Sequence, residues 1–280
     1  MTAASSLDLL EIARSIALEA GALIKKRRAE GVTVAATKSS PQDVVTFADR
    51  ESEDFIRGRL AELRPDDGFF GEESDATSGT SGITWVVDPI DGTVNYLYDI
   101  PQYAVSIAAV RVPAVGGSTD ASTWTALAGC VVNPVTGEVF TATAGGGSFL
   151  GTRRLQVNTD VALAQALVGT GFSYTADLRV KQGRVITGLV GSIRDIRRAG
   201  SAALDLCFVA AGRLDAYFER GLSPWDHAAG ALIAREAGAW VGGFEGAAES
   251  TIMTIAAGPS LAGELVPLVH GLHREAGLPL

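Results

Sequence analysis

Residues 85–101, "WVVDPIDGTVNYLYDIP", join an apolar run to two closely spaced carboxylates. The three apolar residues at its start predict a strand in the protein interior. Asp88 and Asp91 follow at the end of that strand, with only Pro89 and Ile90 between them. Two ionised carboxylates this close repel each other, and partial burial strengthens the repulsion. We therefore expect a positive group between them, toward which the carbonyl oxygen of Ile90 can also point.

The composition bounds the class of protein and the kind of partner. The chain has 280 residues, of which 47% are hydrophobic and 20% are charged, and its formal net charge is −9. This length and hydrophobic content allow one large domain or two small ones with a substantial core. The negative charge disfavours binding to nucleic acids or anionic membranes, which needs a basic surface. A small phosphorylated substrate stays compatible, because bound cations can invert the local charge.

The N-terminal segment and the cysteines indicate a cytoplasmic protein. Residues 5–28 predict an amphipathic helix, in which acidic residues interrupt the apolar stretch and the basic cluster follows it, unlike in a signal peptide. No apolar run has the length needed to span a membrane. Cys130 and Cys207 both lie among apolar residues, which favours two buried, reduced thiols over a disulfide.

The hydrophobic pattern predicts helices around an antiparallel sheet in the first half and α/β alternation in the second. Further helices are expected over residues 46–63, 176–189, 201–211, 226–237 and 259–273. Strands are expected at the start of the quoted stretch and over residues 103–111, 166–172, 214–219 and 252–256, with an antiparallel meander over 127–150. Residues 31–45 suggest a strand or hairpin followed by a loop, residues 66–82 a polar loop, and residues 113–123 a surface insertion.

Four segments each place an acidic residue beside a predicted turn. They are "GEES" with Glu72, "DPID" with Asp88 and Asp91, "TFAD" with Asp49 and "PWDHAAG" with Asp226. Magnesium takes hard oxygen ligands, and two such ions roughly 3.5–4 Å apart can clamp a phosphoryl group and activate water. Asp88 is the natural carboxylate to be shared by both ions. The backbone N–H groups of Gly92 and Thr93, which open the next helical turn, suit a phosphate oxygen.

Each of these acids also has a purely structural interpretation. Asp49 can complete a capping box with Thr46, and Asp226 can simply be favoured by the dipole at a helix N-terminus. Glu72 can be a solvated loop charge, and Glu219 a surface charge that follows its strand. The three histidines, at 227, 270 and 273, are expected to be structural or solvated.

The joint pattern resembles the inositol monophosphatase family, the lithium-sensitive, magnesium-dependent sugar-phosphatase superfamily. "GEES", "WVVDPIDGTVNY" and the distant "PWDHAAG" carry the resemblance, which "TKSSPQDVVTFAD" and "RRAGSAALDLCFVAAGRLDAYFE" extend over nearly the whole chain. The sequence is most similar to bacterial, actinobacterial inositol-1-monophosphatases. The resemblance implies an α+β or α/β fold, a layered α-β-α-β-α sandwich forming one domain over residues 1–280, with sub-regions of about 1–150 and 151–280. It also implies a homodimer.

The implied reaction is hydrolysis of inositol 1-phosphate by in-line attack of magnesium-activated water, with two to three Mg²⁺ ions and no covalent enzyme intermediate. Relatives with similar motifs hydrolyse histidinol phosphate, fructose 1,6-bisphosphate or phosphoadenosine phosphate, and these substrates stay open. Some bacterial relatives also bind the transcription or ribosome-maturation machinery, so a non-catalytic regulatory role is a further alternative. The expected partner is a small phosphorylated polyol, without nucleic acid or membrane.

The resemblance also assigns roles to single residues. The first magnesium would be held by Glu72, Asp88 and the Ile90 carbonyl, and the second by Asp88, Asp91 and Asp226, while Glu72 would also help to hold a loosely bound third ion. Asp49 and Thr93 would polarise the attacking water, and the amides of Gly92 and Thr93 would contact the phosphate. The polyol would lie against Asp91, Ser201, Ala202 and Glu219. Lys38 matches a family lysine near the metals, whereas His227 stands where many relatives carry an apolar residue, a difference that could tune the pocket.

Overall fold

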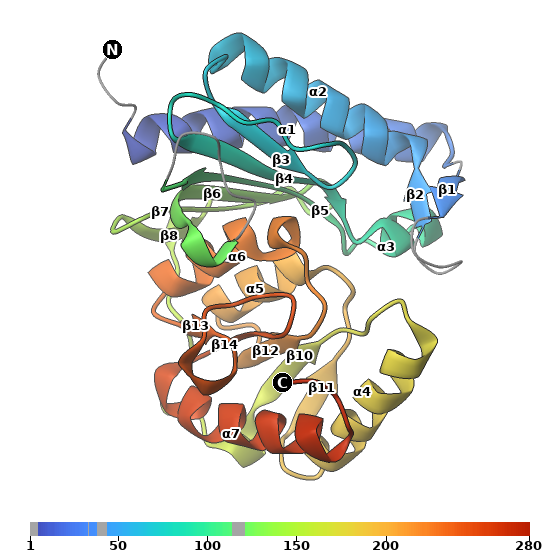
Figure 1. The fold of residues 1–280 in the computed structure, drawn as a ribbon, viewed down its shortest axis with the longest axis vertical. Helices are drawn as coiled ribbons and strands as arrows, with labels where there is room; N and C mark the ends of the chain where they lie inside the picture. The colour runs from blue at the N-terminus through green and yellow to red at the C-terminus, as the bar shows by residue number, and fades with distance from the viewer. Residues whose placement is uncertain (1–4, 33, 38–43, 114–120) are drawn as a thin grey trace.

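The computed structural model describes residues 5–32, 34–37, 44–113 and 121–280, and these form five stacked layers (Figure 1). Two helices cover the outer face of a seven-stranded sheet. Two more helices separate this sheet from a five-stranded one, and a last pair covers the far face of the second sheet. The predicted α-β-α-β-α sandwich is therefore confirmed.

The first outer layer consists of α1 (Ser6–Glu30) and α2 (Phe47–Leu63), as the sequence pattern predicts. The Ser5 and Asp8 side chains form a capping box that starts α1, and Thr46 and Asp49 form one that starts α2. The apolar face of α1 is buried against the sheet, and Ile16 in its middle has no exposed surface. These caps and stripes explain why the two helices could be predicted from sequence alone.

The seven-stranded sheet has the order β3-β4-β5-β6-β7-β8-β9. Its strands are β3 (Gly68–Gly71), β4 (Ile83–Asp91), β5 (Ala104–Arg111), β6 (Thr125–Asn133), β7 (Glu138–Thr143), β8 (Gly147–Leu150) and β9 (Arg153–Arg154). All neighbours are antiparallel except β3 and β4. The meander of β6, β7 and β8 is confirmed. The prediction of a loop throughout residues 66–82 is wrong at β3, where the short "GFFG" between polar turns carries too little pattern to reveal a strand.

The second half provides the remaining layers. Helices α5 (Ala202–Ala210) and α6 (Pro224–Glu236) lie between the sheets, and α4 (Ala176–Leu189) and α7 (Pro259–Glu275) cover the outer face (Figure 1). The five-stranded sheet has the order β11-β10-β12-β14-β13. Its strands are β10 (Leu167–Thr170), β11 (Asp195–Arg197), β12 (Ala216–Glu219), β13 (Trp240–Gly242) and β14 (Thr254–Ala257). The strands β9, β11 and β13, of two or three residues each, were not predicted because they are too short to show a period.

Small elements beside the first sheet complete the fold. The strands β1 (Val34–Thr37) and β2 (Val44–Thr46) pair antiparallel, so the hairpin alternative is confirmed, although its second strand lies where the closing loop was expected. Helix α3 (Thr93–Tyr98) follows β4. Lys38 lies outside the described residues, as do residues 114–120 of the expected insertion, which ends in the short helix η1 (Ala121–Thr123). Among the described residues, no helix is long and apolar enough to cross a membrane.

Candidate active site

A bulge in β4 explains why two aspartates end this strand. In an unbroken strand, residues three apart point to opposite faces of the sheet. Asp88 pairs with Ser106 and Asp91 with Ala104, so β4 uses one residue more than β5 over this interval. A bulge of one residue brings both side chains to the same face. Pro89 fits within it because proline has no N–H to contribute to the ladder.

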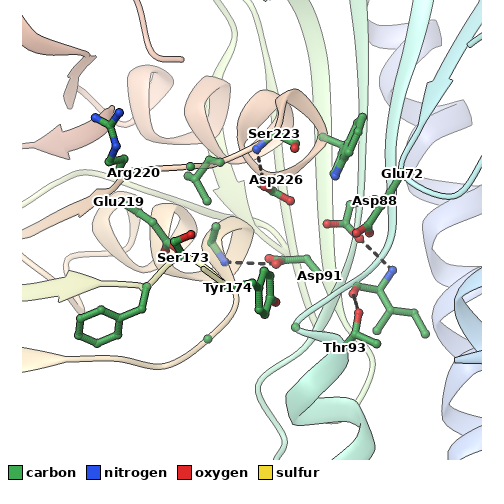
Figure 2. Close-up of a pocket in the computed structure, with 18 of the residues that line it drawn as sticks. Glu72, Asp88, Asp91, Thr93, Ser173, Tyr174, Glu219, Arg220, Ser223 and Asp226 are labelled. Atoms are coloured by element: carbon green, nitrogen blue, oxygen red, sulfur yellow. Dashed lines mark hydrogen bonds between the residues drawn. The ribbon is translucent and has the colours of Figure 1, made fainter. Parts of the chain in front are cut away.

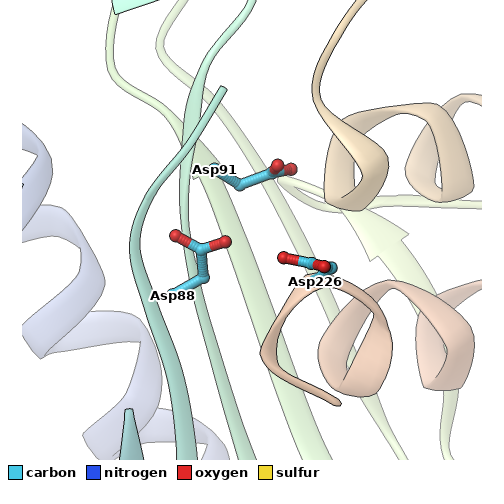
Figure 3. Close-up of side chains that lie close together, drawn as sticks. All are labelled: Asp88, Asp91 and Asp226. Atoms are coloured by element: carbon cyan, nitrogen blue, oxygen red, sulfur yellow. The ribbon is translucent and has the colours of Figure 1, made fainter. Parts of the chain in front are cut away.

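A third carboxylate reaches the same space from the second half of the chain. Asp226 lies in the first turn of α6, and Ser223 caps that helix with its backbone N–H donating to Asp226 Oδ2 at 2.6 Å. One oxygen from each of Asp88, Asp91 and Asp226 lies within 4.8 Å of the others, and Figure 3 shows the three carboxylates around a common space. The three acids assigned to the second magnesium are thus brought together, although 135 residues separate the last two in sequence.

The acids destabilise one another's ionised form. Burial raises the pKa of Asp88 well above its usual range, and the charges of Glu72, Asp91, Asp226 and Asp49 raise it further. Burial, followed by the charges of Glu72 and Asp91, likewise raises the pKa of Asp226. Glu72 lines the same pocket. A cluster of this kind favours any cation that can bind between its oxygens.

Asp91 links the two halves of the molecule through the N-terminus of α5. Its Oδ2 accepts hydrogen bonds from Ser201 Oγ at 2.6 Å and from the Ala203 N–H at 2.7 Å, while its Oδ1 accepts from the Ala202 N–H at 3.3 Å. Burial raises the pKa of Asp91 to about 6, although these hydrogen bonds and the charge of Arg198 oppose the rise. The ionised form is thus held by a helix N-terminus, which favours negative charge.

Asp49 serves as a helix cap and also contacts Thr93, which lines the pocket. Its Oδ2 accepts from the Thr46 backbone N–H at 2.7 Å and from the Thr46 hydroxyl at 2.5 Å. Its Oδ1 lies 3.0 Å from Thr93 Oγ1, which is also 3.1 Å from the Ile90 carbonyl oxygen. The capping and the functional interpretations are therefore compatible, because each uses a different oxygen. Burial raises the pKa of Asp49 to about 6.

Gly92 is required where β4 passes into α3. Its φ is +97°, and a Cβ atom there would lie 2.8 Å from the Gln102 carbonyl oxygen. Glycine adopts this left-handed conformation without strain. The turn places Thr93 at the start of α3, where the first N–H groups have no partner within the helix. Both residues line the pocket.

The acids open into a pocket of about 350 Å³ at the junction of the two halves (Figure 2). Ala202 and Glu219, which were expected to contact the polyol, are among its lining residues. Ser201 is not: it is only 1% exposed, and its hydroxyl donates to Asp91, which does line the pocket. Ser201 is thus linked to the pocket through Asp91, while its direct contact with the substrate stays a prediction.

Several lining residues were missed from sequence. They are Phe172, Ser173, Tyr174 and Thr175 after β10, together with Arg198, Arg220 and Trp225. Residues 172–175 follow the carboxyl end of a parallel strand, where open α/β sheets commonly bind ligands, and that signal could have indicated them. Arg198 lies three residues before Ser201 in the quoted "RRAGSAALDL", but no local pattern shows that its charge reaches Asp91 and Glu219.

Glu219 is held in the pocket wall by its neighbours. Tyr217 donates its hydroxyl hydrogen to Glu219 Oε2 at 2.6 Å. A Cβ atom on residue 171 would lie 1.9 Å from the same oxygen, so Gly171 leaves room for the carboxylate. Burial raises the pKa of Glu219 to about 7. The solvated surface charge considered as an alternative is therefore excluded.

His227 points into the protein core. It is 2% exposed and does not line the pocket, and neither ring nitrogen has a hydrogen-bond partner in the part of the chain that the structure describes. Burial lowers its pKa to about 4, so the ring is neutral. The expectation of a structural histidine holds, and a tuning of the pocket by His227 stays a prediction.

The donor set fits a hard divalent cation. The converging atoms are carboxylate oxygens, with the Ile90 carbonyl nearby, and they provide the oxygen ligands that magnesium prefers. The described residues place no sulfur or imidazole ligand in this cluster. Burial, and then the charges of the neighbouring acids, raise the pKa values of Asp88 and Asp226, and a bound cation would favour the ionised form of both.

The layered sandwich with an acidic cluster between its halves defines a fold of the sugar-phosphatase type. Residues 6–273 match the model of the Inositol monophosphatase family, so the chain belongs to this family. An inositol-1-monophosphatase SuhB from Mycobacterium tuberculosis is 45% identical over 289 residues, covering 96% of this chain and 95% of that protein. A Nus factor SuhB from Pasteurella multocida is 41% identical over 240 residues, covering 85% and 86%. The structure of an IMPase from Thermotoga maritima is similar with a TM-score of 0.84 and 30% identity, covering 96% and 100% of the two chains.

Proposed function

We propose that this protein is a magnesium-dependent phosphate monoester hydrolase that acts on inositol 1-phosphate. The convergence of Asp88, Asp91 and Asp226 in a pocket that also contains Thr93, the partner of Asp49, supports this proposal most strongly. Glu72, Asp88 and the Ile90 carbonyl would hold one ion, and Asp88, Asp91 and Asp226 a second. Glu72 would also contribute to a weaker third site.

The chain's own groups suit the orientation of an attacking water. Magnesium would neutralise the carboxylates, counter the phosphate charge and make water more acidic. Thr93 has one hydroxyl hydrogen, and when it donates this to Asp49 Oδ1, its lone pairs can accept a hydrogen from water. Asp49 is ionised above its pKa of about 6, so it can hold the hydroxyl in this direction near neutral pH. The N–H groups of Gly92 and Thr93 would bind a phosphate oxygen.

The far wall of the pocket suits a polyol. Above its pKa of about 7, the ionised Glu219 carboxylate accepts hydrogen bonds from hydroxyl groups, and Asp91 and Ala202 flank the same space. The name of the Mycobacterium tuberculosis relative, an inositol-1-monophosphatase, supports inositol 1-phosphate as the first substrate to test. Histidinol phosphate, fructose 1,6-bisphosphate and phosphoadenosine phosphate are the alternatives within the same chemistry.

A phosphate-release assay with purified protein tests the proposal. We expect hydrolysis of inositol 1-phosphate that requires magnesium and exceeds hydrolysis of the three alternative substrates in kcat/KM. The Asp91→Asn variant is the control, because it keeps the side-chain shape and removes one charge. It should retain less than a tenth of wild-type kcat, which corresponds to an activation barrier that is higher by more than about 1.4 kcal/mol. Absence of magnesium-dependent release from every substrate would refute the proposal.

A second candidate is a non-catalytic role in transcription. The Pasteurella multocida relative is named a Nus factor, and this observation alone favours the alternative. The net charge of −9 disfavours direct contact with RNA, so such a role would act through protein partners. Capture of the same transcription proteins by wild-type protein and by Asp91→Asn would support a role independent of catalysis.

The homodimer and the inhibition by lithium both stay predictions from the family resemblance. Light scattering of the purified protein should give twice the chain mass of 29.0 kDa. Lithium should lower the rate of phosphate release at fixed magnesium. A monomeric mass, or a rate unaffected by lithium, would contradict the respective prediction.

A further inference from the structure

One face of α2 carries three buried polar side chains where an apolar stripe is usual. Asp49, Ser52 and Glu53 have exposed fractions of 0%, 0% and 1%. Their spacing of three and four residues places them on the same side of the helix. Asp49 contacts Thr93, as described above, and the other two contact different turns of the site. The role expected of Asp49, orienting the attacking water, does not explain why Ser52 and Glu53 are buried as well.

Glu53 binds the turn that carries Glu72, through the two residues that follow it. Its Oε2 accepts the Glu73 backbone N–H at 2.8 Å, and its Oε1 accepts the Ser74 hydroxyl in a short hydrogen bond. A Cβ atom on residue 71 would lie 2.3 Å from Glu53 Oε2, so Gly71 is what allows the carboxylate to approach. Glu72 is therefore preceded by Gly71, which leaves room for the Glu53 carboxylate. It is followed by Glu73 and Ser74, which both donate hydrogen bonds to Glu53.

The same helix also holds the neighbouring turns. The Ser52 hydroxyl donates to the Pro89 carbonyl at 3.3 Å, inside the bulge that presents Asp88. Arg57, one turn further along α2, donates to Ser74 Oγ at 2.7 Å and to the Asp75 carbonyl at 2.8 Å. Its guanidinium also lies 4.2 Å from the centre of the Phe69 ring in β3. Consecutive residues of one rigid element thus bind the turn of Glu72 and the turn of Asp88.

We propose that Glu53 is a positioning residue that sets the distance of Glu72 from Asp88 and thereby the affinity of the first magnesium site. The inference rests on the proposed function, since it presumes that Glu72 and Asp88 bind a metal. Side chains that orient metal ligands act through geometry, and their loss typically weakens metal binding roughly 10- to 100-fold. Glu53 contacts backbone and hydroxyl groups beside the ligand, and it does not line the pocket itself.

Three variants separate this role from a contribution to folding alone. Glu53→Ala removes both hydrogen bonds to the turn. Glu53→Gln keeps them, because its amide oxygen can accept the Glu73 N–H while its NH₂ group donates to Ser74 Oγ. Asp54→Ala is the matched control, since Asp54 follows Glu53 on α2 but is exposed.

The measurements are magnesium binding by calorimetry and melting temperature in EDTA and in magnesium, both without substrate. We expect Glu53→Ala to bind magnesium at least tenfold more weakly and to show a smaller magnesium-induced rise in melting temperature. Glu53→Gln should restore most of the affinity, and Asp54→Ala should bind like wild type. Turnover of Glu53→Ala should recover as magnesium is raised, with KM for the substrate nearly unchanged at saturating metal.

The outcomes distinguish failure of this inference from failure of the proposed function. A folded Glu53→Ala variant that binds magnesium with wild-type affinity, and is only less stable in EDTA, would overturn the positioning role alone. If Glu53→Ala does not fold, Ser74→Ala replaces it, since it removes one of the two bonds and should weaken magnesium binding several-fold; unchanged affinity there is equally decisive against the inference. A wild-type protein that binds no magnesium would overturn the proposed function and this inference with it.

Discussion

Replacing Asp91 by asparagine should stabilise the metal-free protein and reduce the stabilisation that magnesium provides. Asp91 is 8% exposed, and its pKa is raised from an ordinary 3.8 to about 6. At about 1.4 kcal/mol for each pH unit, its ionised form costs the folded state ~3 kcal/mol at pH 8. Asparagine carries no charge and removes this cost.

The hydrogen bonds of Asp91 set the size of the opposing loss. The amide oxygen of asparagine can take the place of Oδ2 and keep the bonds from Ser201 at 2.6 Å and Ala203 at 2.7 Å. The NH₂ group then faces the Ala202 N–H, so the longest bond, of 3.3 Å, is lost at a cost of about 1 kcal/mol. A net gain of ~2 kcal/mol remains, which corresponds to a rise of about 3 °C in the melting temperature of the metal-free protein.

The gain should depend on pH in a defined direction. Because the pKa of Asp91 is higher in the folded than in the unfolded state, the folded protein binds more protons between about pH 3.8 and 6. The stability of the metal-free wild type therefore falls as the pH rises through this window, and the cost is complete above it. The advantage of Asp91→Asn should accordingly be largest at pH 8 and shrink toward pH 5.

Magnesium should shrink the stability advantage of Asp91→Asn. It binds the folded cluster but has little to bind in the unfolded chain, so it stabilises wild type by about 2.7 kcal/mol at a hundredfold excess over Kd. Asp91→Asn should gain less, since one ligand charge is gone. The assay is a series of melting curves against magnesium at constant ionic strength, with Asp54→Asn as the control for loss of an exposed charge on α2. A full wild-type magnesium shift in Asp91→Asn would show that Asp91 is not a ligand.

Substitutions at three further positions test separate features of the molecule. Thr93→Val should lower kcat by at least tenfold, because it removes the hydroxyl group that is hydrogen-bonded to Asp49. Thr93→Ser keeps a hydroxyl group and should retain most of the activity. Equal losses of kcat in the two variants, measured in steady-state assays, would exclude a role of the hydroxyl. Glu219→Ala should raise KM for inositol 1-phosphate while barely affecting p-nitrophenyl phosphate, and equal losses on both would limit Glu219 to its structural contact with Tyr217. His227→Leu should raise the melting temperature or leave it unchanged, because it removes two buried nitrogens that have no hydrogen-bond partner in the part of the chain that the structure describes. It should also retain kcat, because residue 227 does not line the pocket. A clear fall in melting temperature would contradict this prediction.

The sequence alone determined most helices, the meander and the short motifs that carry the acids. These features depend on residues close together in the chain, such as the capping pairs Ser5–Asp8 and Thr46–Asp49 or the apolar stripe of α1. The motifs around Glu72 and "DPID" are likewise local, and together with the family resemblance they indicated a metal-dependent phosphatase. Short strands such as β3 and β11 escaped prediction because they are defined by their neighbours in the sheet.

Only the tertiary structure decided how the acids are arranged and what supports them. The bulge that turns Asp88 and Asp91 to one face is a property of the pairing between β4 and β5. The N-terminus of α5 beneath Asp91 and the approach of Asp226 depend on how the second half packs against the first. The hydrogen bond between the Glu73 N–H and Glu53 joins residues that are 20 positions apart, and it leaves no periodic signal in the sequence. Such contacts follow from the packing of elements distant in sequence, so no local window of residues contains the information that specifies them.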